Sequence, residues 1–451
     1  RRHREPRVSI ITRITDINAQ ELEETMTDNF DRRRFLALAA ASAATGTSLA
    51  QTALAQTVPK DKVTVELFGL ATNGYDTVIE AFQKEYPNIT VKWTKFGTDE
   101  FKQALRVGAS SGKMPDLWFN WGGSLAYPYS RAGLTLDLTP RIAELKLDQI
   151  LVPTAITLAQ DRGKLWGVPN RIVPMTIIYR KEMLEKAGVK PADTFQGLEE
   201  ACAKIKAGGG TPFSLGGKFS WMTMRFTDFF IEHFAGPKLH DAIKTMEASW
   251  DQEPVVKAFA KLKEWNTKGY FNSGFLNVDP ATNMQLVYQG KAAMVLEVPT
   301  IELTRLKREN IDPNTYGTFL MPTDHTPRRV SGFQQQLQIS AKAPKDVQDA
   351  ALLFAAYVVR PELAAKHMLA IGGPSAVKGV SPGPDMPIQS QDAAWLKDGL
   401  ELFLPGDQAL PQEMVAAYFE AQDSVILGTM SPAEAAKSVQ TAINGFKARQ
   451  K

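Results

Sequence analysis

The chain has 451 residues, of which 44% are hydrophobic and 22% charged, which is ordinary for a globular protein with a sizeable core. Eight arginines lie within the first 34 residues and the formal net charge of the whole chain is only +3, so no basic face for nucleic acid is predicted. The single cysteine, Cys202, excludes an intramolecular disulfide and a cysteine-based zinc or iron–sulfur site. No apolar run reaches the ~18–20 residues that span a membrane.

The N-terminal segment is typical of an export signal. Asp31-Arg32-Arg33-Arg34-Phe35-Leu36 resembles the twin-arginine motif, an alanine-rich apolar run follows, and Ala53-Leu54-Ala55 offers small residues for cleavage before Gln56. We therefore expect residues 1–55 to be an N-terminal extension and twin-arginine signal peptide, with Met26 as a plausible start. No cysteine lies near the cleavage site, so we expect a periplasmic protein without a lipid anchor. The alternative is a short amphipathic helix that begins a domain.

The next part of the chain alternates between strand and helix patterns. Strands are predicted at 63–68, 89–93 and 114–119, and helices at 75–86 and 98–109, each with its apolar residues on one face. A β-α-β-α-β order predicts a parallel sheet covered by helices, and therefore an α/β fold.

Ligands of such sheets bind beyond the carboxyl ends of the strands, where two loops are informative. One loop contains Asn73, and the other contains Asn120 and Trp121, both with neighbouring glycines. Amide groups hydrogen-bond the hydroxyl groups of a sugar, and an aromatic ring covers its apolar face, so this chemistry suits a polyhydroxylated ligand. The alternative is that Trp121 is a core residue.

Residues 163–188 predict a turn, an extended segment entered through Pro169 and Pro174, a strand at 176–179 and a helix that ends at Gly188. Further along the chain, a helix from 193 places Cys202 inward, which predicts a small core residue rather than a reactive thiol.

The second half of the chain continues the mixed pattern. Helices are predicted over much of 250–290 and at 347–359, and strands at 291–298, 316–321 and 334–340. A loop rich in proline and glycine is predicted at 372–387, followed by three helices, the last of which begins with the capping box of Ser431 and Glu434.

Several short motifs, in one order along residues 60–450, resemble the extracellular solute-binding proteins of ABC importers, of the maltose-binding (family 1) type. The markers in chain order are Phe82-Gln-Lys-Glu-Tyr-Pro-Asn-Ile-Thr-Val91, Gly112-Lys-Met-Pro-Asp-Leu-Trp-Phe119, Gly163-Lys-Leu-Trp-Gly-Val-Pro169 with Tyr179-Arg-Lys-Glu-Met-Leu184, Gly290-Lys-Ala-Ala-Met-Val295, and Tyr316-Gly with Met321-Pro322. The most specific of them is the segment that begins at Gly290.

The resemblance implies the type II periplasmic binding protein fold, in which two α/β lobes built from discontinuous segments close around a hinge on a buried solute. It places residues 56–168 with 299–342 in lobe 1 and residues 169–298 with 343–451 in lobe 2. The chain would cross between the lobes at about 169–176, 297–300 and 341–345.

The same resemblance implies a set of ligand-binding residues that face the cleft from both lobes and from the crossovers. They are Asn73, Asn120, Trp121, Asn170, Arg171, Trp221, Arg225, Glu297, Phe333, Gln335 and Ser375. At 296–300 the chain has Glu-Val-Pro-Thr-Ile where many members of the family have a glycine followed by an aromatic residue. Glu297 could therefore pair with Arg171 or Arg225 instead of contacting the solute.

The function that the resemblance implies is the capture of a carbohydrate, polyol or sugar acid and its delivery to ABC permease subunits at the inner membrane. No catalysis, cofactor, metal or nucleic acid is implied, and we expect a monomer. One alternative is an exported carbohydrate-active enzyme, although the histidines show no H-x-x-x-H spacing and no G-x-S-x-G motif occurs. Another alternative is a ligand-binding subunit of a membrane sensor.

Overall fold

Two separate β-sheets organise the part of the chain that the structure describes. The computed structural model describes residues 58–298, 306, 309–371, 375–380, 382–383 and 385–449, and for residues 368–371 only the backbone. The predicted signal at 1–55 lies outside the described residues, as does part of the loop predicted at 372–387.

The larger sheet is built on the predicted parallel strands. Strand β1 (Val63–Leu70) lies between β2 (Ile89–Phe96) and β3 (Leu117–Asn120), and all three are parallel. On the other side of β3 lies the long strand β11 (Arg329–Ile339), which is antiparallel to β3. The β-α-β-α-β start and the α/β class are therefore confirmed.

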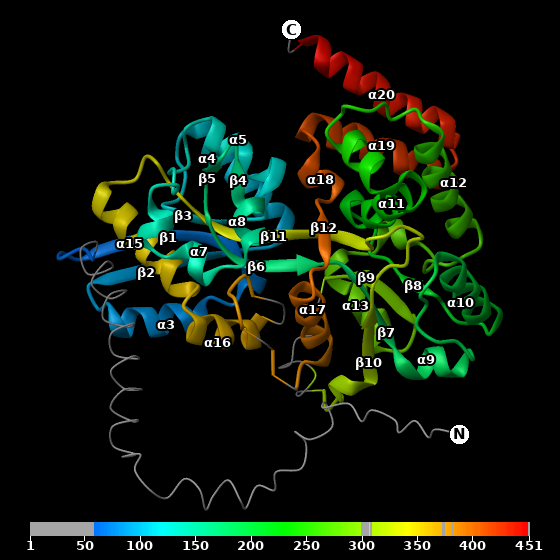
Figure 1. The fold of residues 1–451 in the computed structure, drawn as a ribbon, viewed down its shortest axis with the longest axis horizontal. Helices are drawn as coiled ribbons and strands as arrows, with labels where there is room; N and C mark the ends of the chain where they lie inside the picture. Colours follow the sequence, from blue (N-terminus) through cyan, green and yellow to red (C-terminus); the bar gives the residue numbers. More distant parts are fainter. Residues whose placement is uncertain are drawn as a thin grey trace, which may run out of the picture. The chain divides into compact units, whose positions relative to one another are not determined.

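Helices cover both faces of this sheet. Helix α3 (Asp76–Glu85) buries Val78 and Phe82, and α4 (Thr98–Ser111) buries the apolar face that contains Phe101 and Leu105. Figure 1 shows α4 on one face of the sheet and α3 on the other. Because β1 and β3 are parallel, the loops that follow them both lie at the carboxyl end of the sheet.

The chain passes from the larger to the smaller sheet at a single residue. Strand β6 (Val168–Pro174) pairs with β11 in the larger sheet, and β7 (Thr176–Arg180) belongs to the smaller one. Between them, the amide of Met175 donates a hydrogen bond of 2.8 Å to the carbonyl oxygen of Ser331. Pro169 and Pro174 both lie in β6, which is fully buried.

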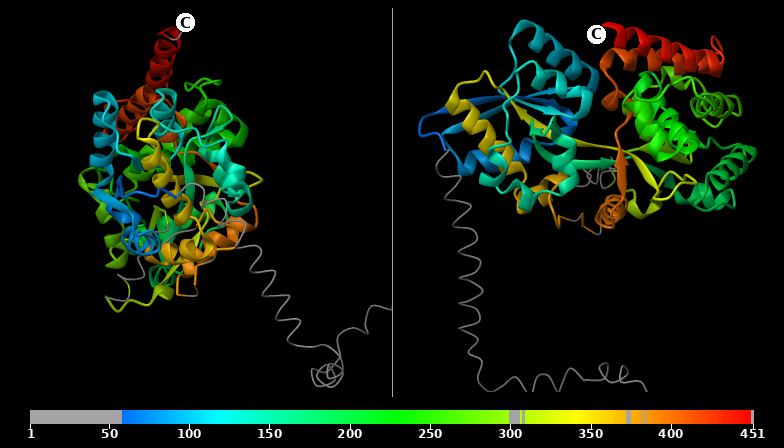
Figure 2. Two further views of the ribbon diagram at one scale, coloured as in Figure 1. Left: turned by 90° about the vertical axis from the view of Figure 1, so that its left-hand side faces the viewer. Right: turned by 45° about the horizontal axis from the view of Figure 1, so that its top comes forward.

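The smaller sheet has the strand order β10-β7-β9-β8, with β8 at Phe213–Ser214, β9 at Met294–Glu297 and β10 at Tyr316–Phe319. Helices α10 (Phe195–Ala207), α11 (Ser220–Lys244) and α12 (Glu253–Thr267) gather on this side of the molecule, as Figure 1 and the right-hand view of Figure 2 show. Cys202 is fully buried in the hydrophobic core.

Several segments lie with the sheet other than the one that the predicted lobe boundaries imply. Strand β12 (Glu401–Phe403), predicted in lobe 2, pairs with β11 of the larger sheet. Tyr316–Phe319, predicted in lobe 1, pairs with β7 of the smaller sheet. Helix α15 (Lys345–Val358), predicted in lobe 2, packs against β1 and β6 of the larger sheet. Strand pairing and helix packing connect residues far apart in the sequence, and the motif order does not record these contacts. The other predicted boundaries stay a prediction.

The start of β11 is held against a kinked helix. Helix α11 bends where Gly236 takes a φ of 72° and Pro237 follows it. Arg329 contacts both sides of the bend: it donates hydrogen bonds to Glu232 at 2.7 and 3.0 Å, to Asp241 at 2.7 and 2.9 Å and to the carbonyl oxygen of Pro237 at 2.9 Å. Arg329 and Glu232 are buried and Asp241 is exposed, and together they fix the strand that carries Phe333 and Gln335.

The remaining elements complete both sides of the molecule. The segment between β3 and β6 contains α5 (Tyr127–Arg131), α6 (Arg141–Glu144), α7 (Leu147–Ile150), α8 (Pro153–Ala159), β4 (Gln160–Asp161) and β5 (Lys164–Leu165). The later elements are α9 (Lys181–Lys186), α13 (Asn283–Tyr288), α16 (Pro361–Ile371), α17 (Pro387–Lys397), β12 (Glu401–Phe403), α18 (Gly406–Ala409), α19 (Gln412–Leu427) and α20 (Pro432–Arg449).

The last helix begins with the predicted capping box. The Ser431 amide donates to Glu434 at 2.8 Å, and the Glu434 amide donates to the Ser431 hydroxyl at 3.3 Å. Within the described ranges, no helix combines the length and the apolar character that a membrane span requires.

Candidate functional site

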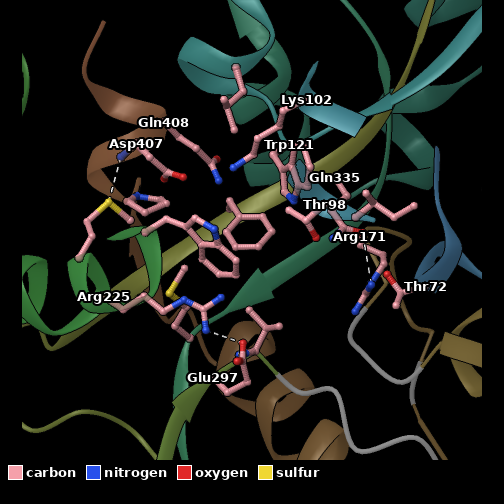
Figure 3. Close-up of a pocket in the computed structure, with 18 of the residues that line it drawn as sticks. Thr72, Thr98, Lys102, Trp121, Arg171, Arg225, Glu297, Gln335, Asp407 and Gln408 are labelled. Carbon is pink, nitrogen blue, oxygen red and sulfur yellow. Dashed lines mark hydrogen bonds and ion pairs between the residues drawn. The ribbon is translucent and has the colours of Figure 1, made fainter. Parts of the chain in front are cut away.

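A cavity of about 380 Å³ lies beside β6 and β11, where the two sheets meet. Its walls come from the loop after β1, from α4, from the loop after β3, from β6 and β11, from the start of α11, from the end of β9 and from α18 (Figure 3). The lining residues are Leu70, Ala71, Thr72, Gly74, Thr98, Lys102, Trp121, Leu125, Arg171, Met175, Trp221, Met224, Arg225, Glu297, Val298, Phe333, Gln335, Pro405, Asp407 and Gln408.

Seven of the predicted site residues line this cavity, although they come from distant parts of the chain. They are Trp121, Arg171, Trp221, Arg225, Glu297, Phe333 and Gln335. The structure therefore brings together most of the set that the resemblance implied. Their contact with a solute stays a prediction.

Two of the predicted residues form hydrogen bonds with other groups of the protein. Asn73 accepts a hydrogen bond of 2.7 Å from the amide of Leu70 and so closes the turn after β1. Asn120 accepts from the amide of Trp121 at 2.8 Å and donates to the side chain of Gln338 at 2.8 Å. Neither residue lines the cavity, because these hydrogen bonds hold both side chains within the protein.

Asn170 and Ser375 also lie outside the cavity lining. Asn170 precedes Arg171 on β6, at the point where the pairing with β11 shifts register, and its side chain donates to the hydroxyl group of Tyr75 at 3.1 Å. Ser375 pairs through its backbone with Arg171, and its hydroxyl oxygen accepts from the amide of Val377 at 3.0 Å.

Arg171 and Gln335 lie opposite each other on β6 and β11, and a hydrogen bond of 3.2 Å joins the Arg171 guanidinium to the Gln335 carbonyl oxygen. Burial lowers the pKa of Arg171 to about 10. The guanidinium therefore still carries its charge at neutral pH, and Gln335 helps to fix its position in the cavity wall.

Arg225 and Glu297 form an ion pair in another part of the wall. Both side chains are buried, and Arg225 also donates to the carbonyl oxygen of Leu296 at 3.3 Å. Glu297 in turn accepts from the amide of Val298 at 2.9 Å. One of the pairings considered from the sequence is thus present, and it neutralises both charges within the cavity wall.

The two tryptophans of the cavity differ in their surroundings. Trp121 is 9% exposed and packs edge-on against Phe119 and Phe101, with ring centroids 4.7 and 5.7 Å apart. Trp221 is less buried, and the guanidinium of Arg225 lies 5.1 Å from its ring centroid. Trp121 is therefore both a core residue and part of the wall.

A lysine links the two rings. The Lys102 ammonium lies 5.4 Å from the ring centroid of Trp121 and 5.7 Å from that of Trp221. These distances are within the range of a cation–π interaction. The sequence reasoning did not select Lys102, although helical spacing from Phe101 and Leu105 places it beside their buried face.

Two further cavity residues, Asp407 and Gln408, come from the short helix α18 and were also missed. Burial raises the pKa of the Asp407 carboxyl group, and the charge of Lys102 acts in the opposite direction. The only local indication in the sequence is a Pro-Gly turn followed by two polar residues. The preceding strand β12 has three residues, too few to show an alternating pattern.

The arrangement is suited to binding a polar solute through hydrogen bonds and ring contacts. Hydrogen-bond donors and acceptors, three aromatic rings and several charged groups converge on one cavity. Among the residues that the structure describes, no group of three histidine, cysteine, aspartate or glutamate side chains is placed to hold a metal ion.

Comparisons with known proteins bear on the family and the fold of the chain. Residues 77–394 match the family model described as "Bacterial extracellular solute-binding protein". A protein of Pyrococcus horikoshii described as an uncharacterised ABC transporter extracellular-binding protein is 25% identical over 237 residues, which cover 50% of this chain and 55% of that protein. The chain thus spans about half the length of this relative.

Two further comparisons extend over more of the chain. The multiple sugar-binding protein of Streptococcus mutans is 23% identical over 345 residues, which cover 73% of this chain and 79% of that protein. The solved structure of a chitin oligosaccharide binding protein superposes with a TM-score of 0.77 at 20% identity, covering 85% of this chain and 99% of that one. This likeness confirms the two-lobed fold.

Proposed function

Because the chain belongs to the family of bacterial extracellular solute-binding proteins, we propose that it captures a sugar or a related polyhydroxylated solute in the cavity beside β6 and β11. The names of the relatives support this solute class, since they include a multiple sugar-binding protein and a chitin oligosaccharide binding protein. Sugar-binding residues would be Trp121, Trp221, Arg171, Gln335 and Phe333.

One observation carries the proposal: hydrogen-bonding side chains and aromatic rings from distant parts of the chain line one cavity. The polar side chains include Arg171, Gln335, Asp407 and Gln408, and the rings are those of Trp121, Trp221 and Phe333. A solute with several hydroxyl groups can donate to and accept from such side chains, and the rings can cover its apolar face.

The charges of the cavity favour a neutral solute over a sugar acid. The positive charge of Arg225 is balanced by Glu297, and Lys102 is close enough to Asp407 for its charge to influence the pKa of that carboxyl group. A polyol or sugar would enter without adding a charge that the wall has to compensate.

We further propose delivery of the captured solute to the permease subunits of an ABC importer at the inner membrane. In this view the protein is a monomer in the periplasm, exported by the twin-arginine signal of residues 1–55 and without a lipid anchor. It binds its solute and performs no catalysis. Closure of the two lobes around the hinge strands would present the loaded form to the permease.

A thermal-shift screen tests the proposal. The chain from Gln56 would be melted with galactose, raffinose, xylobiose, chitobiose and galacturonic acid, each at a concentration far above its expected dissociation constant. A bound sugar at 100 times its dissociation constant stabilises a protein by about 2.7 kcal/mol. We expect a neutral sugar to raise the melting temperature. If only galacturonic acid does so, the neutral class is wrong, and if none does so, sugar capture is contradicted.

A further inference from the structure

We propose that Ser124 is a positioning residue that holds the two sides of the cavity together through hydrogen bonds to Asp407 and Gln412. These three residues are called the Ser124 latch below. The inference rests on the proposed function only in taking the cavity as the solute site. It adds a residue that does not line the cavity and yet sets how readily the cavity closes.

Ser124 uses both the hydrogen and the oxygen of its hydroxyl group in the latch. The hydroxyl group donates a hydrogen bond of 3.0 Å to the carbonyl oxygen of Asp407. The hydroxyl oxygen accepts a bond of 3.0 Å from the side-chain amide of Gln412. The same amide also donates to the Asp407 carbonyl oxygen at 2.9 Å. Three hydrogen bonds thus join three residues, and replacement of Ser124 by alanine removes two of them at once.

Ser124 belongs to the side of the larger sheet. It lies in the short 3-10 helix η2 (Gly123–Leu125), which follows strand β3 closely. Asn120, the last residue of β3, donates a hydrogen bond of 3.1 Å to the carbonyl oxygen of Leu125. This bond fixes η2 to the end of the strand, so we expect Ser124 to move with the larger sheet.

Asp407 and Gln412 belong to the other side. The amide of Gly406 donates a hydrogen bond of 2.6 Å to Asp228, and the amide of Asp407 donates to the sulfur atom of Met224 at 3.1 Å. Both acceptors lie on α11, which gathers with α12 on the side of the smaller sheet (Figure 1). Gln412 begins α19, which packs against α11 and α12. The latch therefore spans the two sides.

The two sides also approach each other beside the latch. Gly123 precedes Ser124, and a Cβ atom added there would overlap with the carbonyl oxygen of Gln408 and lie 3.0 Å from its Cβ atom. A residue without a side chain thus lets α18 come close to the Ser124 hydroxyl group. At a second point, the ammonium of Lys102 on α4 lies 5.7 Å from the ring centroid of Trp221 on α11. The sides are therefore in contact at more than one place.

The strength of the latch suits a contact that opens and closes. Ser124 is half-buried and Gln412 is exposed, so water replaces the lost bonds when the sides separate. A net hydrogen bond of this kind shifts an equilibrium by roughly two- to tenfold. The latch therefore raises the fraction of closed molecules without locking them, and the apparent affinity for a solute rises with that fraction.

The test measures the distance between the two sides in the full chain without a solute. Spin labels are attached to Val107→Cys on α4 and Leu427→Cys at the end of α19, positions that are 57% and 66% exposed. Cys202 is fully buried, so it does not take up the label. Double electron–electron resonance gives the distribution of separations. We expect a short separation to dominate in the labelled chain, and Ser124→Ala to raise the ratio of long to short separations about fivefold or more.

Further variants assign the change to the latch. Gln412→Ala, at an exposed position, also removes two of the three bonds and should act in the same direction. Because Ser124 and Gln412 share one bond, the double variant should shift the ratio by less than the product of the single shifts. Ser438→Ala is the matched control: Ser438 is half-buried like Ser124, and its hydroxyl group donates to the carbonyl oxygen of Ala435 within α20. This control should leave the distribution unchanged.

The outcomes separate this inference from the proposed function. If no sugar binds but Ser124→Ala and Gln412→Ala lengthen the separation, sugar capture fails and the latch stands. If a sugar binds and neither variant changes the separation, the latch is overturned and the function stands. A long separation that dominates before any latch residue is replaced, or an equal shift in Ser438→Ala, also overturns the latch.

Discussion

Arg225 and Glu297 form a buried ion pair in the wall of the cavity, between the first turns of α11 and the end of β9. The sequence predicts that both residues contact the solute, and both line the cavity while neutralising each other. The pair joins two segments that pack side by side around the smaller sheet, so its contribution to stability can be measured apart from any solute.

Glu297→Gln should lower the free energy of unfolding by about 3 kcal/mol, because it leaves the Arg225 guanidinium buried without its carboxylate. The measurement is denaturation by urea, monitored by circular dichroism. Replacing both residues together, as Arg225→Met with Glu297→Leu, removes both charges and should recover most of this loss. A single variant as stable as the unaltered chain would contradict the account of the pair.

Trp121→Ala and Trp221→Ala should have different effects. Trp121 packs edge-on against Phe101 and Phe119, so its removal should cost about 3–5 kcal/mol of stability. Trp221 is less buried, so its replacement should cost less stability than that of Trp121. Trp221→Ala should weaken sugar binding at least as much as Trp121→Ala does. Urea denaturation and a sugar titration on each variant compare the two effects. Equal stability losses would show that both rings serve the core alike.

Gly123→Ala should weaken sugar binding, because a Cβ atom there would lie 3.0 Å from Cβ of Gln408 and closer still to the Gln408 carbonyl oxygen. Gly123 also has a φ of 55°, which costs a non-glycine residue about 1 kcal/mol. Gly133→Ala is the matched control: Gly133 has a φ of 68°, and an added Cβ atom would meet nothing within 4 Å. Both variants should lose some stability, and only Gly123→Ala should lose affinity in a sugar titration.

The group around Glu232 should make the protein sensitive to acid. Burial acts to raise the pKa of Glu232, but hydrogen bonds from His240 and Arg329 lower it to about 2. A carboxyl group with a depressed pKa contributes stability above the ordinary value of 4.5, and this contribution is lost as the pH falls from 4.5 toward 2. The loss should amount to about 3 kcal/mol.

Urea denaturation at a series of pH values measures this loss. Glu232→Gln should be less stable near neutral pH and should show a flatter decline below pH 4.5. Burial lowers the pKa of His240, which adds a decline of the same sign that begins at higher pH. Glu247→Gln, at an exposed position, is the control and should keep the steep decline. Parallel curves for Glu232→Gln and the unaltered chain would show that Glu232 is not the group responsible.

The sequence was sufficient for features that depend on local patterns. Alternating and helical apolar patterns identified the strands and helices of the larger sheet, and the order of the motifs identified the family. Arg171, Trp221 and Glu297 were found because they stand beside crossovers or at the ends of predicted strands. Asn170 lies where the pairing of β6 with β11 shifts register, and its side chain donates to the hydroxyl group of Tyr75 and does not line the cavity.

Other features depend on contacts between distant residues. Asn73 and Asn120 have the chemistry of a sugar site, but hydrogen bonds to Leu70 and Gln338 hold them inside the protein. Asp407 reaches the cavity because Asp228, which is distant in the sequence, binds the amide of Gly406. Local sequence composition does not indicate which side chains bond to each other or which distant residue holds a helix in place. These placements therefore required the structure.

Titration calorimetry of the chain from Gln56 with neutral sugars tests the central claim most directly. The account predicts that at least one sugar binds with a single site per chain and a micromolar or lower dissociation constant, and that Trp221→Ala weakens this binding at least about tenfold. The absence of binding heat for every sugar, at temperatures chosen to avoid a vanishing enthalpy, would contradict it.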